Sequence, residues 1–101
     1  MSSIKDVLYV NSLLDIYGDL LTANQIKIMR MYYEFNLSFG EIADELSISR
    51  AAVNDTIKKS IILLNKYENC LNLLQKRNKL HELCDKIDGN DDVKKEIKEV
   101  L

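Results

Sequence analysis

Apolar residues recur at helical spacing along the chain, and the pattern is clearest between Ser38 and Lys59. Two short apolar faces follow each other there: Ile42, Ala43 and Leu46 on the first, and Ala52, Val53 and Ile57 on the second. Ser47 and Ile48 lie between the two faces as a turn, and we expect Ile48 to fill the angle between the helices. A small alanine suits the point where two helices cross at a steep angle. Segment 38–59 therefore predicts a helix-turn-helix motif.

Capping residues mark where both helices of the motif begin. Ser38 is a typical N-cap, and Glu41 three residues later completes a capping box. Ser49 is the expected cap of the second helix. One position departs from the usual pattern, because Ser47 occupies the turn position that commonly carries glycine. Serine adopts the left-handed conformation at a cost of about 1 kcal/mol, so Ser47 is compatible with the motif.

Two further helices are expected before the motif. The first runs from Ile4 to Tyr17 and ends at Gly18. The second follows Thr22, an N-cap with glutamine at the capping-box position, and runs to about residue 35. Their expected inward-facing residues are Ile4, Val7, Leu8, Leu14 and Tyr17 in the first helix and Ile26, Met29, Tyr32 and Tyr33 in the second. The aromatic residues recur at helical spacing and indicate a core rather than a surface that stacks bases.

The chain from Ser49 to Ile87 contains no glycine or proline. One helix of that length would span about 55–60 Å, which exceeds the width of a domain of this size. The helix either breaks near residues 75–78 and folds back, or projects and buries its apolar residues against a second chain. Those residues are Leu64, Tyr67, Leu71, Leu74, Leu80, Leu83, Cys84 and Ile87. Gly89 ends this region, and Asn90 is expected to cap a last helix with Val93, Ile97, Val100 and Leu101 as its apolar stripe.

The composition agrees with an all-α fold. The 101 residues include no proline and three glycines, and 47% of them are hydrophobic. A chain of this length forms one domain. We therefore expect a single all-helical domain over residues 1–101, with the helix-turn-helix at 38–59 and a helical extension at 60–101 that serves for dimerisation.

Metal, enzymatic and membrane functions are not expected. Cys70, Cys84 and the single histidine, His81, are too few for a disulfide framework or a closed zinc site, so we expect buried or half-buried thiols and no cofactor. The sequence lacks a glycine-rich phosphate loop and an isolated pair of carboxylates, which argues against an enzyme. No apolar run approaches 18 residues, and no leader opens the chain. These features predict a cytoplasmic protein in a reducing compartment.

Charge is distributed unevenly along the chain. The net charge is −2, but residues 1–46 carry −4, residues 47–84 carry +4 and the remainder carries −2. Positive charge thus collects on the second helix of the motif and its continuation, where contacts to phosphate would be needed. About three or four phosphate contacts give weak, salt-sensitive binding unless two copies act together. The alternative interpretation is that these lysines form the solvated face of a long helix.

The outer face of the second motif helix carries the candidate nucleic-acid contacts, because in a DNA reader this face meets the major groove. The candidates are Ser49, Arg50, Asn54, Lys58 and Lys59. Asn54 could bond adenine through N6 and N7. Asp55 lies three and four residues before the two lysines and is interpreted as their ion-pair partner rather than as a reader of cytosine.

The stretch GEIADELSISRAAV, preceded by YGDLLT at residues 17–22, resembles the YlxM-type family of small bacterial helix-turn-helix proteins. The resemblance covers about residues 3–88, and the motif is also similar to region 4 of bacterial sigma factors. Members of the family are typically encoded beside the genes of the signal recognition particle. The resemblance therefore implies a DNA-binding or regulatory role in that secretion pathway.

Two positions depart from the family pattern. The residues that match it are Arg50, Val53, Asp55 and Ile57. Ala51 stands where such proteins often carry glutamine, and Asn54 where they often carry an aromatic residue. The amide missing at position 51 argues against sequence-specific recognition of DNA.

Two functions remain open. The first is a dimeric regulator that inserts residues 49–59 into the major groove of duplex DNA. The second is a partner of signal recognition particle protein or RNA, which uses the helix-turn-helix as a scaffold and docks through the long helix near Leu71, Leu74 and Arg77. Membrane insertion is not expected.

Overall fold

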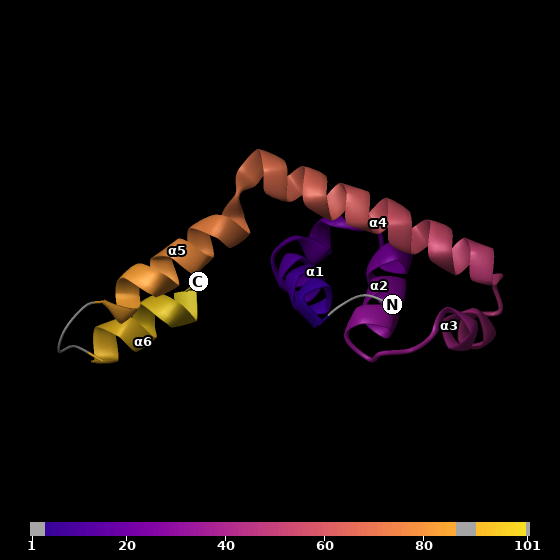
Figure 1. Cartoon of the computed structure of the whole chain (residues 1–101), viewed down its shortest axis with the longest axis horizontal. Helices are drawn as coiled ribbons and strands as arrows, with labels where there is room; N and C mark the ends of the chain where they lie inside the picture. Colours follow the sequence, from indigo (N-terminus) through magenta and orange to yellow (C-terminus); the bar gives the residue numbers. More distant parts are fainter. Residues whose placement is uncertain (1–3, 87–90, 101) are drawn as a thin grey trace. The chain divides into compact units, whose positions relative to one another are not determined.

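The computed structural model describes residues 4–86 and 91–100, and every regular element within them is a helix (Figure 1). The elements are α1 (Ile4–Tyr17), the short 3₁₀ helix η1 (Gly18–Leu20), α2 (Ala23–Tyr33), α3 (Phe39–Leu46), α4 (Arg50–Leu71), α5 (Leu73–Asp85) and α6 (Asp91–Val100). The predicted all-α helix-turn-helix fold is confirmed. The chain divides into two compact units, residues 1–71 and residues 72–101. No helix in the described ranges combines the length and apolar character needed to cross a bilayer.

In the first unit, α1, α2 and α3 pack along one side of the long helix α4 (Figure 1). The buried residues described in this unit are Val10, Leu13, Leu14, Tyr17, Gly18, Leu21, Ile28, Met29, Tyr33, Ile42, Ala43, Val53, Ile57, Ser60 and Leu64. In α4 they form the stripe 53, 57, 60 and 64, which is the 4-3-4 spacing of one helix face. This stripe holds α4 in place and leaves its opposite face exposed.

The inward face of α1 differs from the prediction. Leu8 is 62% exposed, whereas Val10 and Leu13 are buried together with Leu14 and Tyr17. Helix α1 is apolar on several sides, so its spacing alone is compatible with more than one inward face. In α2 the buried positions are Ile28, Met29 and Tyr33, while Ile26 and Tyr32 are half-buried. Packing against α4 determines which apolar face of α1 and of α2 is buried.

The predicted helix starts are confirmed by their hydrogen bonds. Thr22 and Gln25 form a full capping box, with bonds of 3.0 and 3.1 Å. Gly18 follows the last residue of α1, as expected, but its backbone is not left-handed. Its role is spatial, because an added Cβ would lie 2.9 Å from Cδ1 of Ile26. Glycine at this position therefore allows α2 to approach closely.

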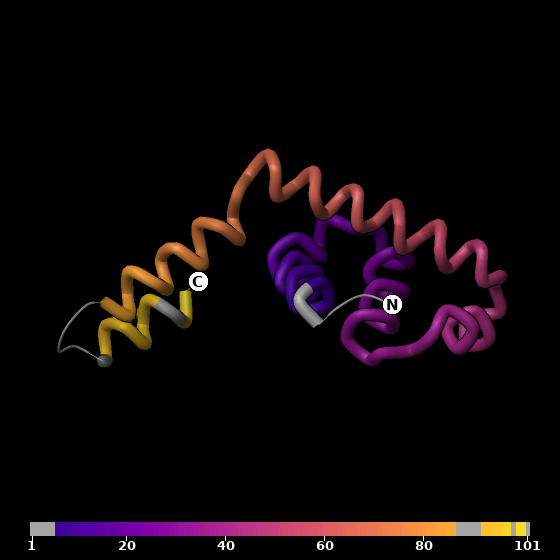
Figure 2. Tube along the Cα trace, in the orientation of Figure 1, coloured from indigo at the N-terminus to yellow at the C-terminus, as the bar shows by residue number. Residues whose placement is uncertain are grey.

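The long helix breaks at Asn72, three residues before the predicted region 75–78 (Figure 2). Asn72 has φ 53° and ψ 31°, a left-handed conformation that ends α4 at Leu71 and lets α5 begin at Leu73. Asparagine tolerates this conformation better than most non-glycine residues. The break therefore needs neither the glycine nor the proline that the sequence lacks.

In the second unit, α5 packs against α6, and two residues of α5, Leu74 and Cys84, are buried. The Sγ atom of Cys84 donates to the carbonyl oxygen of Lys94 at 3.6 Å. The prediction of buried or half-buried thiols holds for Cys84 and is wrong for Cys70, which is exposed near the end of α4. Leu80 and Leu83, expected on an inner apolar face, are 45% and 46% exposed.

The last helix begins next to residues outside the described ranges. The predicted stop at Gly89 and cap at Asn90 fall there, as do Ile87 and Leu101. Within α6, Val93 is 41% exposed and Val100 is 85% exposed, so neither is a core residue of this unit.

Candidate nucleic-acid interface

The motif consists of α3, a short turn and the first turns of α4. Ser38 and Glu41 form the predicted capping box, with bonds of 3.0 and 3.1 Å. Ser47 has φ 56° and ψ 43°, and the backbone N–H of Ile48 donates to Ala43 O at 3.0 Å. Serine thus takes the left-handed turn position, as predicted.

The crossing of α3 and α4 is built from Ile42, Ala43, Val53 and Ile57, none of which is more than 6% exposed. Two predicted members of the crossing lie elsewhere. Ala52 is exposed, because it precedes Val53 by one residue and is rotated about 100° away from the inner stripe. Ile48 is 38% exposed, so it is not part of the buried core of the crossing.

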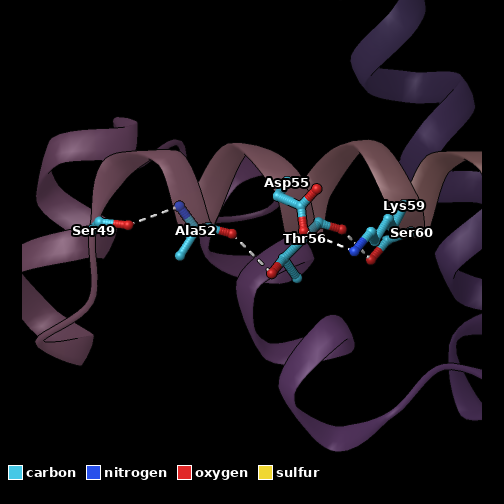
Figure 3. Close-up of polar contacts among 6 residues, drawn as sticks. All are labelled: Ser49, Ala52, Asp55, Thr56, Lys59 and Ser60. Atoms are coloured by element: carbon cyan, nitrogen blue, oxygen red, sulfur yellow. Dashed lines mark hydrogen bonds and ion pairs between the residues drawn. The ribbon is translucent and has the colours of Figure 1, made fainter.

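Hydrogen bonds along α4 fix its first turns (Figure 3). Ser49 Oγ accepts the backbone N–H of Ala52 at 3.0 Å, which confirms Ser49 as the N-cap. Thr56 Oγ1 donates to Ala52 O at 2.9 Å, and the buried Ser60 Oγ donates to Thr56 O at 2.7 Å. The capping bond uses the oxygen of Ser49, so its hydroxyl hydrogen is still available for a phosphate.

The predicted contact residues lie on the solvent side of α4. Ser49, Arg50, Lys58 and Lys59 are exposed, and Asn54 is half-buried. Arg50, Asn54 and Lys58 are four residues apart and form one stripe along the helix. Asp55 Oδ2 lies 3.0 Å from Lys59 Nζ, so Asp55 is an ion-pair partner, as predicted, but of Lys59 rather than of both lysines. We call Arg50, Asn54 and Lys58 the outer stripe.

Sequence reasoning missed a neighbour of Arg50, Gly40 in the first turn of α3. A Cβ added at Gly40 would lie 2.8 Å from Nη2 of Arg50. Both residues line a surface pocket of about 580 Å³ together with Val7, Tyr32, Asn36, Leu37, Ser38, Phe39 and Glu41. The available signal was the glycine itself, which stands inside a helix with no turn to explain it.

Glu41 is the acidic residue of this pocket, and its charge is engaged by the helix start. The backbone N–H of Ser38 donates to Glu41 Oε1 at 3.0 Å. This bond, followed by the bond to the Ser38 side chain, lowers the pKa of the Glu41 carboxyl below its ordinary value. The carboxylate is therefore ionised at neutral pH and stabilises the start of α3.

No metal site accompanies the interface in residues 4–86 and 91–100, where no group of three or more His, Cys, Asp or Glu side chains is placed to hold an ion. His81 Nε2 is buried and has no hydrogen-bond partner in this part of the chain. His81 and Cys84 remain two side chains of one helix without further ligands.

Residues 4–101 match the UPF0122 family, which is described as "Putative helix-turn-helix protein, YlxM / p13 like". A UPF0122 protein of Clostridium acetobutylicum is 39% identical over 94 residues, covering 93% of this chain and 72% of the relative. One of Bacillus thuringiensis is 42% identical over 96 residues, covering 91% of this chain and 87% of the relative.

A third relative aligns over a shorter stretch. The UPF0122 protein of Clostridium kluyveri is 47% identical over 70 residues, which are 69% of this chain and 63% of the relative. The family match spans both units of the structure and includes the whole motif. The chain therefore belongs to the UPF0122 family of YlxM/p13-like helix-turn-helix proteins.

Proposed function

We propose that this protein binds duplex DNA by placing the outer stripe of α4 in the major groove. The observation that carries the proposal is the division of α4 into two faces. Val53 and Ile57 lock one face into the core, while Arg50, at the edge of that face beside α3, and Lys58 are both exposed to solvent. A rigid helix with cations on its free face is what a helix-turn-helix reader requires.

The side chains divide into phosphate and base contacts. Arg50 and Lys58 carry unpaired charges within the described part of the chain and serve as phosphate contacts, joined by the Ser49 hydroxyl at the helix start. Asn54 is the only amide of the outer stripe and the candidate reader of adenine. Lys59 reaches DNA only by leaving Asp55. Because most of these side chains contact phosphates rather than bases, we expect the protein to bind DNA with little sequence preference.

A regulatory role in the signal recognition particle pathway is the biological context we propose. It is supported by the resemblance to YlxM-type proteins, whose genes typically lie beside those of that particle. Cytoplasmic localisation belongs to the same proposal.

Two copies joined through the second unit would double the few phosphate contacts of one motif. Sedimentation that gives a monomer at about tens of micromolar would exclude the dimer.

An alternative function, binding to signal recognition particle protein or RNA, is favoured by the surface of α5. Leu73, Leu80 and Leu83 are 43–46% exposed there, beside the basic Lys76 and Arg77. Leu74, which was predicted to belong to the docking face, is buried and is not available for docking. Leu80→Ala and Arg77→Ala are therefore the variants that test this surface.

The deciding experiment is fluorescence anisotropy with random duplex DNA and with signal recognition particle RNA across a salt series. Arg50→Ala/Lys58→Ala is compared with Lys27→Ala/Arg30→Ala, which removes equal charge from α2 behind the buried face of α4. We expect the first pair to lower the salt slope on DNA by about 1.8, the value for two phosphate contacts. The control pair leaves the slope unchanged.

Two other outcomes would redirect the interpretation. If both double variants lowered the salt slope of DNA binding equally, only the net charge of the protein would matter for binding. The outer stripe would then have no special role. The alternative function would be favoured if the anisotropy showed no binding to duplex DNA but did show binding to the RNA. In that case Leu80→Ala and Arg77→Ala should weaken the RNA binding.

A further inference from the structure

Gly40 and Arg50 are in direct contact where the first turns of α3 and α4 meet. A Cβ at position 40 would lie 2.8 Å from Nη2 of Arg50 and 3.1 Å from both Cζ and Nε. All three of these atoms belong to the guanidinium group. The end of the Arg50 side chain therefore occupies the space that any residue other than glycine would need.

The local backbone gives no other reason for glycine at position 40. Gly40 lies inside α3, two residues after the N-cap Ser38, and its φ is not in the left-handed range. Glycine is among the least favourable residues in a helix. The distinctive property of Gly40 is thus the absence of a side chain beneath Arg50.

Contact with Gly40 leaves the polar atoms of the Arg50 guanidinium group without a partner in the part of the chain that the structure describes. Within the described ranges, no ion pair joins Arg50 to an acidic residue, and no hydrogen bond engages its guanidinium group. Glu41 lines the same pocket, but its carboxylate accepts the backbone N–H of Ser38. The N–H donors of Arg50 are consequently free, and a guanidinium group presents such donors to a phosphate in pairs.

We infer that Gly40 is a positioning residue for Arg50, and that it holds the guanidinium group against α3 so that its free donors meet a DNA phosphate. The inference rests on the proposed binding of duplex DNA and adds to it a residue outside α4. Position 40 acts through Arg50 alone and does not itself touch DNA. A guanidinium group held before binding loses less conformational freedom when the contact forms.

Gly40→Ala tests this role without disturbing the fold. The three atoms nearest to the new Cβ all belong to the far end of a flexible side chain, so we expect Arg50 to swing away while both helices stay in place. Because alanine favours a helix over glycine, the melting temperature should stay level or rise. Affinity for random duplex DNA should fall nevertheless, by up to about fivefold, the size of one exposed charge contact.

A double-mutant cycle assigns the loss to Arg50. Arg50→Ala should weaken binding and lower the salt slope by about one, and adding Gly40→Ala to it should weaken binding no further. Gly18→Ala is the control, since its Cβ would also meet the end of a flexible side chain, that of Ile26, outside the motif. Gly18→Ala should leave the affinity for DNA unchanged.

A second measurement tests the contact without DNA. The ¹⁵N relaxation of Arg50 Nε–Hε should indicate a restrained side chain in the unaltered protein and a mobile one in Gly40→Ala. Equal mobility in both proteins would overturn the inference, and so would additive losses in the cycle. Absence of duplex binding by the unaltered protein would instead refute the proposed function, and with it any role of Gly40 in DNA binding.

Discussion

The hydrogen bond between Tyr17 and Glu68 ties the end of α1 to the last turns of α4. Tyr17 is 1% exposed, and its hydroxyl donates to Glu68 Oε1 at 2.7 Å. The Tyr17 ring also lies 6.0 Å from the ring of Tyr67, centroid to centroid. Tyr17→Phe removes the hydroxyl and keeps the ring, so the substitution isolates the hydrogen bond from the packing.

The expected loss follows from the burial of the two partners. A hydrogen bond to a charged group contributes about 1.5–3 kcal/mol. Glu68 is half-buried, so water replaces part of the bond on the carboxylate side. We therefore expect Tyr17→Phe to lower the free energy of unfolding by about 1–2 kcal/mol, which corresponds to roughly 4–16 °C in melting temperature for a domain of this size.

Chemical denaturation followed by circular dichroism measures this loss, and Tyr9→Phe is the matched control. The Tyr9 hydroxyl donates to Asn65 Oδ1 at 3.4 Å between exposed side chains, so its removal should cost less than about 0.5 kcal/mol. Glu68→Gln completes a cycle that isolates the pairwise coupling. Equal effects of the two Tyr→Phe variants, or no coupling in the cycle, would refute the reasoning.

Two further predictions concern the motif. Ser47→Gly relieves the left-handed conformation at φ 56° and should stabilise the protein by about 0.5 kcal/mol, while Ser47→Ala gives no such gain in the same denaturation assay. The pKa of Glu41 is lowered in the folded protein, so its stabilising effect is present above the unfolded-state pKa and is lost as pH falls through the folded-state value. Melting temperatures of the unaltered protein and Glu41→Gln should thus differ at pH 7 and converge in acid, and a constant difference would contradict this assignment.

Sequence patterns predicted the local features of the motif well. Both capping boxes, the Ser49 cap and the left-handed Ser47 depend on residues within a few positions of each other. Such features follow from side-chain and backbone chemistry that a short peptide already contains. The predicted contact residues Arg50 and Lys58 are also exposed, as expected for charged side chains outside the buried stripe that contains Val53 and Ile57.

The predictions that failed concern choices among several apolar faces. Leu8 and Leu80 have the spacing of inward-facing residues but are exposed, and Ile48 and Ala52 lie outside the crossing of α3 and α4. Hydrophobic spacing identifies a helix that has an apolar side. It does not select a side when the helix has more than one.

The sequence by itself determined the helical elements, their caps, the turn and the charged outer face of α4, because each depends on contacts between near neighbours in the chain. Only the tertiary structure decided the inner faces, the break at Asn72, the contact of Gly40 with Arg50 and the bond between Tyr17 and Glu68. Tyr17 and Glu68 are 51 positions apart, and they meet because α1 packs against α4. Contacts of this kind depend on how whole helices pack together.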